Sequence, residues 1–240
     1  MGDMDFRYAG KELELFSSAT RWKEYWSGKI RNYFSGSVLE VGAGTGANVS
    51  YLWNPNVVRW LCVEADSGLV DTIRRRIQIG ELPASCVGFH GTVQDLPPAE
   101  QFDTAVYIDV LEHIRDDEGE LRSAADHVAD GGRLIVVAPA YNWLFSEFDR
   151  AIGHCRRYTA DSLLRLSPAG TRCETHFYLD SVGLLASMGN RFFLKQSNPS
   201  RHLIAFWDRV LVPISMVIDR LFDFAFGKTI VVVWRREKQP

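Results

Sequence analysis

The residues best suited to bind a ligand lie in the segment Val38–Gly46, where an apolar run leads into the closely spaced glycines G-x-G-x-G. Glycine adopts backbone angles that are closed to other residues and lets a ligand lie directly against the main chain. Glu40, just before the glycines, would repel a pyrophosphate but can attract a cationic ammonium group, directly or through water. The loop therefore favours a nucleotide-like ligand with a positive end over a dinucleotide, whose G-x-G-x-x-G loop also spaces the third glycine differently.

Acidic residues follow the next two apolar runs. Glu64 ends the second run, where a carboxylate can accept hydrogen bonds from both ribose hydroxyls. Asp66 suits the cap of the helix that follows. Asp95 lies in the turn after the third run, where an acidic surface residue is the plainer interpretation if the turn is taken alone. The order of glycine loop, Glu64 and Asp95 favours one shared ligand over three unrelated turns.

These motifs resemble the cofactor-binding segments of class I S-adenosylmethionine-dependent methyltransferases. Asp103–Ile114 continues the resemblance, which covers roughly the first 140 residues. It implies S-adenosylmethionine as the cofactor, with Glu64 on the ribose, Asp95 on the adenine amino group and Asp109 between methyl group and substrate. The cofactor contacts that we predict are Glu40, Gly42, Ala43, Gly44, Gly46, Glu64, Ala65, Gln94, Asp95, Leu96 and Asp109.

A metal site is a second interpretation of the fourth apolar run. Asp109, Glu112 and His113 have a spacing that gathers oxygen and nitrogen ligands on one side of a helix. They look like the E-x-x-E-H magnesium motif of ubiquinone-biosynthesis O-methyltransferases and small-RNA 2′-O-methyltransferases, with a shorter Asp in first place. Many metal-independent relatives carry a similar L-E-H segment, so we expect no metal.

The segment Ala138–Thr159 carries the candidate acceptor chemistry. It resembles the P-A…W-L…D…G-H-x-R-R-Y-T signature of a type 11/12-like methyltransferase subgroup with varied acceptors. We predict His154 as general base, with Asp109 as the other catalytic residue, because imidazole titrates near neutral pH. Paired arginines can bind a carboxylate or phosphate. The predicted acceptor contacts are Trp143, Arg156, Arg157 and Tyr158. In the alternative interpretation, Asp149 pairs with an arginine and His154 only braces the loop.

Seven strands must position these residues. We predict them at 37–41, 57–64, 86–90, 103–108, 133–138, 171–177 and 229–234. The first five alternate with segments long enough for crossover helices, which predicts a doubly wound, mostly parallel α/β sheet with helices on both faces. We expect this Rossmann-like fold as one domain over 1–240, with a substrate-side insertion after the fifth strand. Its parts are a helical lid (1–36, with Trp22, Tyr25 and Trp26), a cofactor core (37–138), substrate-side helices (139–227), and a last strand and tail (228–240).

Composition excludes several classes of function. The 240 residues carry a net charge of −3, which gives no field for nucleic acid. The four cysteines are scattered, so we expect reduced, buried thiols, and the polar N-terminus lacks a signal peptide. We expect a cytoplasmic monomer or homodimer. Charges interrupt the apolar stretch Leu203–Phe226, which excludes a spanning helix but suits an amphipathic helix pair. Core or lid packing is the favoured role of this stretch, and a dimer surface or a peripheral membrane contact are the others.

The combined prediction is transfer of the sulfonium methyl group to an oxygen, less readily a nitrogen or carbon. The acceptor is a small-molecule, glycan or lipid-linked compound with anionic character, and S-adenosylhomocysteine is the product. Proximity and alignment would supply most of the catalysis, because this cofactor is already electrophilic. Two alternatives stay open, a nicotinamide-dependent oxidoreductase and a non-catalytic cofactor-binding scaffold.

Overall fold

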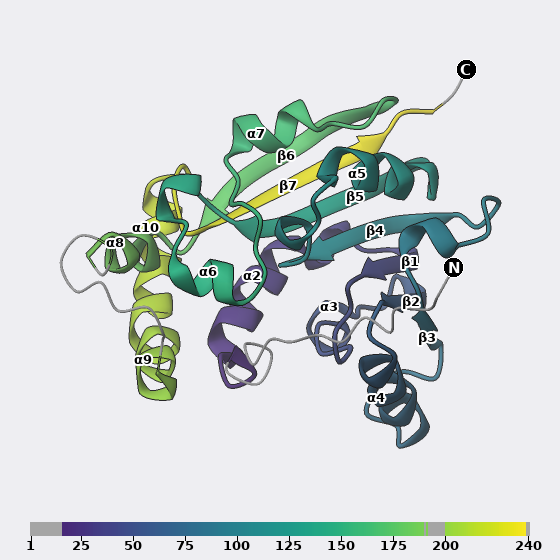
Figure 1. Cartoon of the computed structure of the whole chain (residues 1–240), viewed down its shortest axis with the longest axis horizontal. Coiled ribbons are helices and arrows are strands. Elements are labelled where there is room, and N and C mark those ends of the chain that lie inside the picture. Colours follow the sequence, from purple (N-terminus) through teal and green to yellow (C-terminus); the bar gives the residue numbers. More distant parts are fainter. Residues whose placement is uncertain (1–15, 190, 192–199, 239–240) are drawn as a thin grey trace.

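The computed structural model describes residues 16–189, 191 and 200–238, which build a seven-stranded sheet between helical layers (Figure 1). The strand order is β3-β2-β1-β4-β5-β7-β6. Strands β1 to β5 pair in parallel, and β7 runs antiparallel to both of its neighbours. The strands are β1 (Gly36–Val41), β2 (Val57–Glu64), β3 (Cys86–His90), β4 (Phe102–Ile108), β5 (Val128–Pro139), β6 (Thr171–Leu179) and β7 (Thr229–Arg236). This arrangement confirms the predicted doubly wound fold, and β2 and β3 have the predicted bounds.

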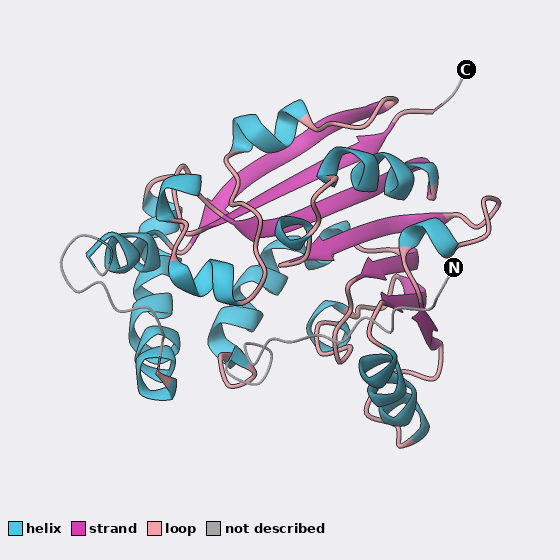
Figure 2. Cartoon of the chain, in the orientation of Figure 1, coloured by secondary structure: helices cyan, strands magenta, loops and turns pink. Residues whose placement is uncertain are grey.

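Helices lie on both sides of this sheet (Figure 2). The longer ones are α2 (Thr20–Ile30), α4 (Ser67–Gln78), α5 (Asp117–Asp126) and α10 (Val212–Leu221). The shorter ones are α3 (Val49–Leu52), α6 (Glu147–Ala151), α7 (Ala160–Arg165), α8 (Ser181–Gly189) and α9 (Arg201–Phe206). Asp66 caps α4 as predicted, since its side chain accepts hydrogen bonds from the amides of Gly68 and Leu69.

The crossovers differ from the prediction in two places. The chain between β3 and β4 forms a single 3-10 turn, Val93–Asp95, where we expected a helix. Pro97 and Pro98 follow this turn, and proline disfavours helical angles in the residue before it. The crossover helix between β1 and β2 is short, because turns occupy the chain up to Asn48 and α3 has only four residues.

Two apolar layers, one on each face of the sheet, fix the strands. Strand β1 contributes Leu39 and Val41 to one layer and Val38 to the other, as expected for side chains that alternate along a strand. Trp60 of β2 is fully buried in the second layer and stacks on Phe34 with ring centroids 5.5 Å apart. This packing fixes the positions of the strands, and with them the loops that follow their carboxyl ends.

The C-terminal helices form one run rather than the predicted pair. α9 continues through a π-helical turn, Trp207–Leu211, into α10, and the backbone angles at both junctions are helical. Within the described residues, we find no helix with the length and apolar character needed to cross a membrane. The prediction of buried thiols was wrong for Cys155, which is exposed, and Cys173 is partly exposed.

Candidate functional site

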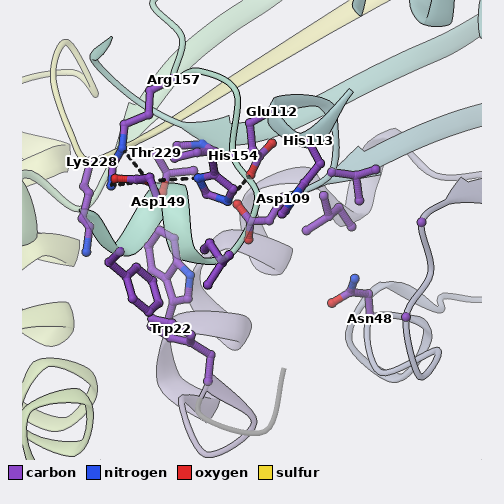
Figure 3. Close-up of a pocket in the computed structure, with 18 of the residues that line it drawn as sticks. Trp22, Asn48, Asp109, Glu112, His113, Asp149, His154, Arg157, Lys228 and Thr229 are labelled. Atoms are coloured by element: carbon purple, nitrogen blue, oxygen red, sulfur yellow. Dashed lines mark hydrogen bonds and ion pairs between the residues drawn. The ribbon is translucent and has the colours of Figure 1, made fainter. Parts of the chain in front are cut away.

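One cavity of about 1730 Å³ opens above the carboxyl ends of the parallel strands (Figure 3). The glycine loop and Glu64 line one side of it. Asp109 lies between this side and the other, to which His154 and Arg157 belong. Ligands bind at this edge of open α/β sheets, because the loops after neighbouring strands meet there. Cofactor and acceptor residues that are far apart in the sequence thus share one space.

The glycine loop depends on backbone angles that favour glycine. Gly42, Gly44 and Gly46 have φ values of +68°, +57° and +70°. A Cβ atom on Gly42 would lie 2.6 Å from the Val110 side chain, so substitution there meets both strain and a clash. The amides of Gly42 and Ala43 both bond to the carbonyl of Val63, which ties the loop to β2. Gly42, Ala43 and Gly44 line the cavity, whereas Gly46 packs toward Leu82 and Ile73.

Glu64 closes the loop from the neighbouring strand. Its Oε2 accepts a 2.8 Å hydrogen bond from the Gly44 amide, and its Oε1 accepts one of 3.0 Å from the Asp66 amide. The residue is 7% exposed and faces the cavity together with Ala65. A carboxylate has about four lone-pair sites, so two acceptor positions are left for hydroxyl groups of a ligand.

Glu40 lies behind the loop rather than in the cavity. It is 1% exposed, and its two oxygens accept hydrogen bonds of 2.9 Å from Asn48 and from the Trp60 indole. Burial raises its pKa to about 7. Asn48 itself lines the cavity. Any influence of Glu40 on a ligand therefore passes through Asn48 or through space.

The predicted adenine contacts lie away from the cavity lining. Gln94 donates to Glu120 over 2.8 Å, and Leu96 is buried in an apolar layer. Asp95 is exposed and accepts hydrogen bonds from the Thr92 amide and hydroxyl, which lower its pKa. The residues of this turn that line the cavity are Gly91 and Thr92. The adenine contact of Asp95 stays a prediction.

Asp109 follows β4 in a left-handed conformation, with φ of +53°. Its amide bonds to the Val137 carbonyl over 2.9 Å, and its side chain opens to the cavity. The residue is accessible from the cavity, but the protein around it desolvates the carboxylate and raises its pKa to about 6, although His154 and Lys228 oppose the shift. The residue thus places a titratable group between the two sides of the cavity.

The second side is organised by Asp149 of α6. This residue is 1% exposed and accepts hydrogen bonds of 2.9 Å from His154 Nδ1 and 3.0 Å from two nitrogens of Arg157 (Figure 3). The bonds from His154 and Arg157 hold its pKa well below the usual range against burial. Because Asp149 is then a carboxylate, Nδ1 of His154 is the donor, and Nε2 is left with its lone pair. Asp149 and His154 thus form a hydrogen-bonded pair, called the Asp149–His154 dyad below. The predicted pairing of Asp149 with an arginine is also present.

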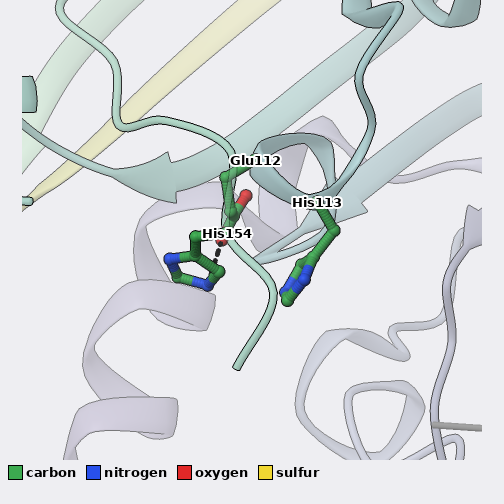
Figure 4. A group of neighbouring side chains, drawn as sticks. All are labelled: Glu112, His113 and His154. Carbon is green, nitrogen blue, oxygen red and sulfur yellow. Dashed lines mark ion pairs between the residues drawn. The ribbon is translucent and has the colours of Figure 1, made fainter. Parts of the chain in front are cut away.

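Glu112 and His113 extend this cluster (Figure 4). Oε1 of Glu112 lies 3.7 Å from Nε2 of His154, and the His113 ring meets the His154 ring edge-on with centroids 4.6 Å apart. One ligand atom from each of the three residues lies within 4.8 Å of the others, so the set could hold a divalent cation. The carboxyl group of Glu112 is fully buried, its oxygens have no hydrogen-bond partner among the described residues, and burial raises its pKa. Burial also lowers the pKa of His113 to about 4, which keeps that imidazole neutral.

Three predicted acceptor residues are not brought to the cavity. Arg156 pairs with Asp117 at 2.5 Å on the outer surface, and the Tyr158 hydroxyl is buried against the same Asp117 at 2.8 Å. Trp143 is exposed and packs on Tyr141. Arg157 alone of the four lines the cavity, and its buried NH1 has no hydrogen-bond partner among the described residues. Successive residues of the extended loop point to opposite sides, which separates the two arginines.

Lys228 and Asp180 are cavity residues that the sequence analysis missed. The turn Gly227-Lys228 before the last strand could have indicated Lys228. The sequence did not reveal the direction of that strand in the sheet, however, and therefore not the edge at which the turn lies. Because β7 is antiparallel, its first residue Thr229 pairs with Pro139 at the carboxyl end of β5, and Lys228 enters the cavity beside it. Asp180 follows β6 and reaches the same edge. Burial lowers the pKa of Lys228, and Asp180, Asp149 and Asp109 oppose this shift.

Helix α2 covers the cavity from the N-terminal side. Trp22 and Trp26 line it, and the hydroxyl of buried Tyr25 donates to Asp219 over 2.8 Å. Trp22 also packs on Trp207, with ring centroids 5.5 Å apart. The part of the predicted lid at 1–15 lies outside the described residues.

Comparison with known proteins gives a consistent result. A family model described as a methyltransferase domain matches residues 14–177. Among curated proteins, no sequence matches this chain. Solved structures with the same fold include an S-adenosylmethionine-dependent methyltransferase from Clostridium acetobutylicum (TM-score 0.58, 11% identity, covering 95% of this chain and 98% of that one).

Two further structures show how varied proteins of this fold are. Coclaurine N-methyltransferase, solved with N-methylheliamine and S-adenosylhomocysteine, has a TM-score of 0.60 and 15% identity, with 97% of this chain and 76% of that chain covered. The 4+2 cyclase SpnF has a TM-score of 0.63 and 14% identity, with 96% and 95% covered. At these identities the likeness concerns the fold alone.

Proposed function

The chain belongs to the methyltransferase-domain family, and from this premise we propose that it methylates a hydroxyl oxygen of an anionic acceptor. It is an S-adenosylmethionine-dependent methyltransferase with a Rossmann-like fold. The acceptor that we propose is a small molecule or a lipid-linked compound with a carboxylate or phosphate near the hydroxyl.

The residues of the first side fit the cofactor. Gly42, Ala43 and Gly44 line the cavity, and the small glycines let a ligand approach the main chain closely. The two acceptor positions left on Glu64 suit the ribose hydroxyls, and Asn48 offers an amide to the methionine end. When bound, S-adenosylmethionine supplies an electrophilic methyl group.

The hydrogen bond between Asp149 and His154 carries the proposal. It fixes the orientation of the imidazole, because Nδ1–H donates to the Asp149 carboxylate. The lone pair of Nε2 is then available to a hydroxyl group. Asp149 thus acts as a positioning residue. In the transfer, the new oxygen–carbon bond would form as the carbon–sulfur bond breaks and S-adenosylhomocysteine leaves. Nε2 of His154 would take the proton of the acceptor hydroxyl, and the buried charge of Asp149 would stabilise the resulting imidazolium. An amine acceptor would not need this base, so the dyad favours oxygen.

Two cations support an anionic acceptor. NH1 of Arg157 has no hydrogen-bond partner within the described part of the chain, although Asp149 holds the rest of the guanidinium in place, and Lys228 lines the same cavity. A carboxylate or phosphate between them would form charge-assisted hydrogen bonds. Asp109, on the cofactor side of this space, lies between the two halves of the cavity and is suited to orienting the acceptor hydroxyl.

A turnover assay with matched variants tests the proposal. Release of S-adenosylhomocysteine is measured with a panel of hydroxy acids and phosphate monoesters, and active acceptors are then assayed with His154→Ala. We expect kcat to fall by about 10² to 10⁴, with the Kd of S-adenosylhomocysteine unchanged. His176→Ala, an exposed histidine on β6, should match the wild type.

Other outcomes separate the alternatives. Equal turnover of His154→Ala would remove it as the base. Acceptors that are all amines would move the reaction to nitrogen. A thermal shift with NAD but none with S-adenosylmethionine would indicate an oxidoreductase, and cofactor binding without product from any acceptor would indicate a scaffold.

A further inference from the structure

The helical run Arg201–Leu221 turns an apolar stripe toward solvent. Six large side chains recur at intervals of three or four residues, which places them on one side of a helix. Their exposed fractions range from 41% to 73%. This outward stripe consists of Leu203, Phe206, Val210, Ile214, Val217 and Leu221.

The polar side of the same run faces the protein. Asp208 is buried and accepts hydrogen bonds from the amides of Arg21 (3.4 Å) and Trp22 (2.8 Å). Asp219 is buried and accepts three of 2.8 to 2.9 Å, from the Tyr25 hydroxyl and the amides of Asp180 and Ser181. These bonds fix the rotation of the helix. The outward position of the stripe is therefore built in, and the acids that interrupt the apolar sequence are removed from the surface.

The charges left beside the stripe are mainly positive. Arg209 and Arg220 are exposed, and neither forms an ion pair with any residue in the described part of the chain. Arg21 joins them, since its guanidinium bonds to the Arg209 carbonyl over 3.2 Å. Asp223, past the end of α10, is the exposed acid of this region. A chain with a net charge of −3 thus presents a cationic, apolar face at one place.

We propose that the outward stripe docks this protein on an anionic lipid bilayer. Figure 1 shows α9 and α10 at the end of the molecule opposite α4 and β3, so that a flat surface can reach them. The run would lie in the interface with its apolar side chains among the acyl chains and its arginines at the phosphates. A second copy of the chain fits less well, because a symmetric contact would bring Arg209 and Arg220 against like charges.

The stripe also borders the cavity. Leu203 and Phe206 are about half exposed and also line the large cavity. On the proposed function, an amphipathic acceptor could pass from the bilayer to His154 without leaving an apolar path. The docking itself does not depend on which acceptor is methylated.

Vesicle flotation with the full chain tests the docking. We expect the protein to float with vesicles of phosphatidylcholine and phosphatidylglycerol, to remain unbound with phosphatidylcholine alone, and to be released by salt. Val217→Asp should weaken partitioning about tenfold, since it removes an inserted side chain and adds a negative charge. Ile79→Asp is the matched control, because both side chains are 60% exposed and Ile79 ends α4 far from the stripe.

A second pair of variants removes charge alone. Arg220→Gln should weaken binding about fivefold, whereas Arg122→Gln on α5 should leave it unchanged. Equal loss for stripe and control variants, or no flotation of the wild type with anionic vesicles, overturns the proposal. A dimer that Val217→Asp dissociates, without vesicle binding, would assign the stripe to a second copy. Flotation needs no methyl transfer, so its result is independent of the proposed reaction.

Discussion

The two sides of the cavity are built by different means. On the cofactor side, main-chain amides and the positive φ angles of glycines form the surface of the site. Glu64 accepts hydrogen bonds from the nearby amides of Gly44 and Asp66. On the acceptor side, charged side chains from four separate segments converge on Asp149, His154 and Lys228. A backbone-built site tolerates few changes of shape. A side-chain-built site can change its ligand by single substitutions, which suits a fold found with such varied functions.

The largest effect on cofactor binding is expected at the backbone-built side. Gly42→Ala should weaken S-adenosylhomocysteine binding by about 100-fold, because a left-handed angle costs roughly 1–2 kcal/mol for alanine and the new Cβ meets Val110. Calorimetry measures the Kd. Gly80→Ala has a similar φ of +77° with no atom within 4 Å, and should cost only stability. Equal affinity of Gly42→Ala and wild type would show that cofactor binding does not depend on the backbone shape of this loop.

A smaller effect is expected at the side-chain-built side. Lys228→Met keeps the length of the side chain but removes its charge, and should raise the KM for an anionic acceptor about tenfold. Arg156→Ala, next in sequence to the cavity arginine but outside the lining, should change KM less than twofold. Steady-state kinetics at constant ionic strength distinguishes the two. If Arg156→Ala were the more damaging variant, the acceptor would bind elsewhere.

Stability should depend on pH through both sides. Burial raises the pKa of Asp109 to about 6 and that of Glu40 to about 7, so the folded state holds protons that the unfolded chain releases near pH 4. Their contributions are present at low pH and are lost as pH rises through 6 and 7. Calorimetry should therefore show the midpoint of unfolding falling by about 5 to 10 °C between pH 5 and pH 8.

The two carboxyl groups can be separated in the same experiment. Asp109→Asn should remove the part of the decline that ends near pH 6, and Glu40→Gln the part that continues to about pH 7. Asp149 acts in the opposite direction, since its pKa is lowered and its contribution is lost only in stronger acid. A midpoint that rises from pH 5 to pH 8 would be inconsistent with the two raised values.

The smallest effect is expected from metal removal. Turnover should change less than twofold in a chelator, because a carboxyl group with a raised pKa, as at Glu112, is a poor ligand when it is neutral. Magnesium and zinc titrations in the presence of S-adenosylhomocysteine provide a direct measurement. Heat of binding that disappears in Glu112→Gln would instead assign a metal to Glu112, His113 and His154.

Much of the fold could be predicted from local pattern. Apolar runs of strand length gave all seven strands, with exact bounds for β2 and β3. The turn between β3 and β4 could not be distinguished from a helix by length alone, and the prolines that exclude one carry the decisive signal. We predicted a pair of helices in the region Leu203–Phe226, where Pro213 and charged residues interrupt the apolar sequence. In the structure Pro213 lies in the first turn of α10, where proline is tolerated.

The sequence by itself determined the glycine loop and Glu64 on the cofactor side, because strand, loop and terminal carboxylate are fixed by neighbouring residues and backbone angles. Tertiary structure decided the acceptor side. Whether Arg156 or Arg157 faces the cavity depends on Asp149, and the entry of Lys228 depends on the antiparallel direction of β7. The same holds for the outward stripe, whose orientation follows from the hydrogen bonds of Asp208 and Asp219. Side-chain convergence depends on contacts between distant segments, which local sequence does not encode.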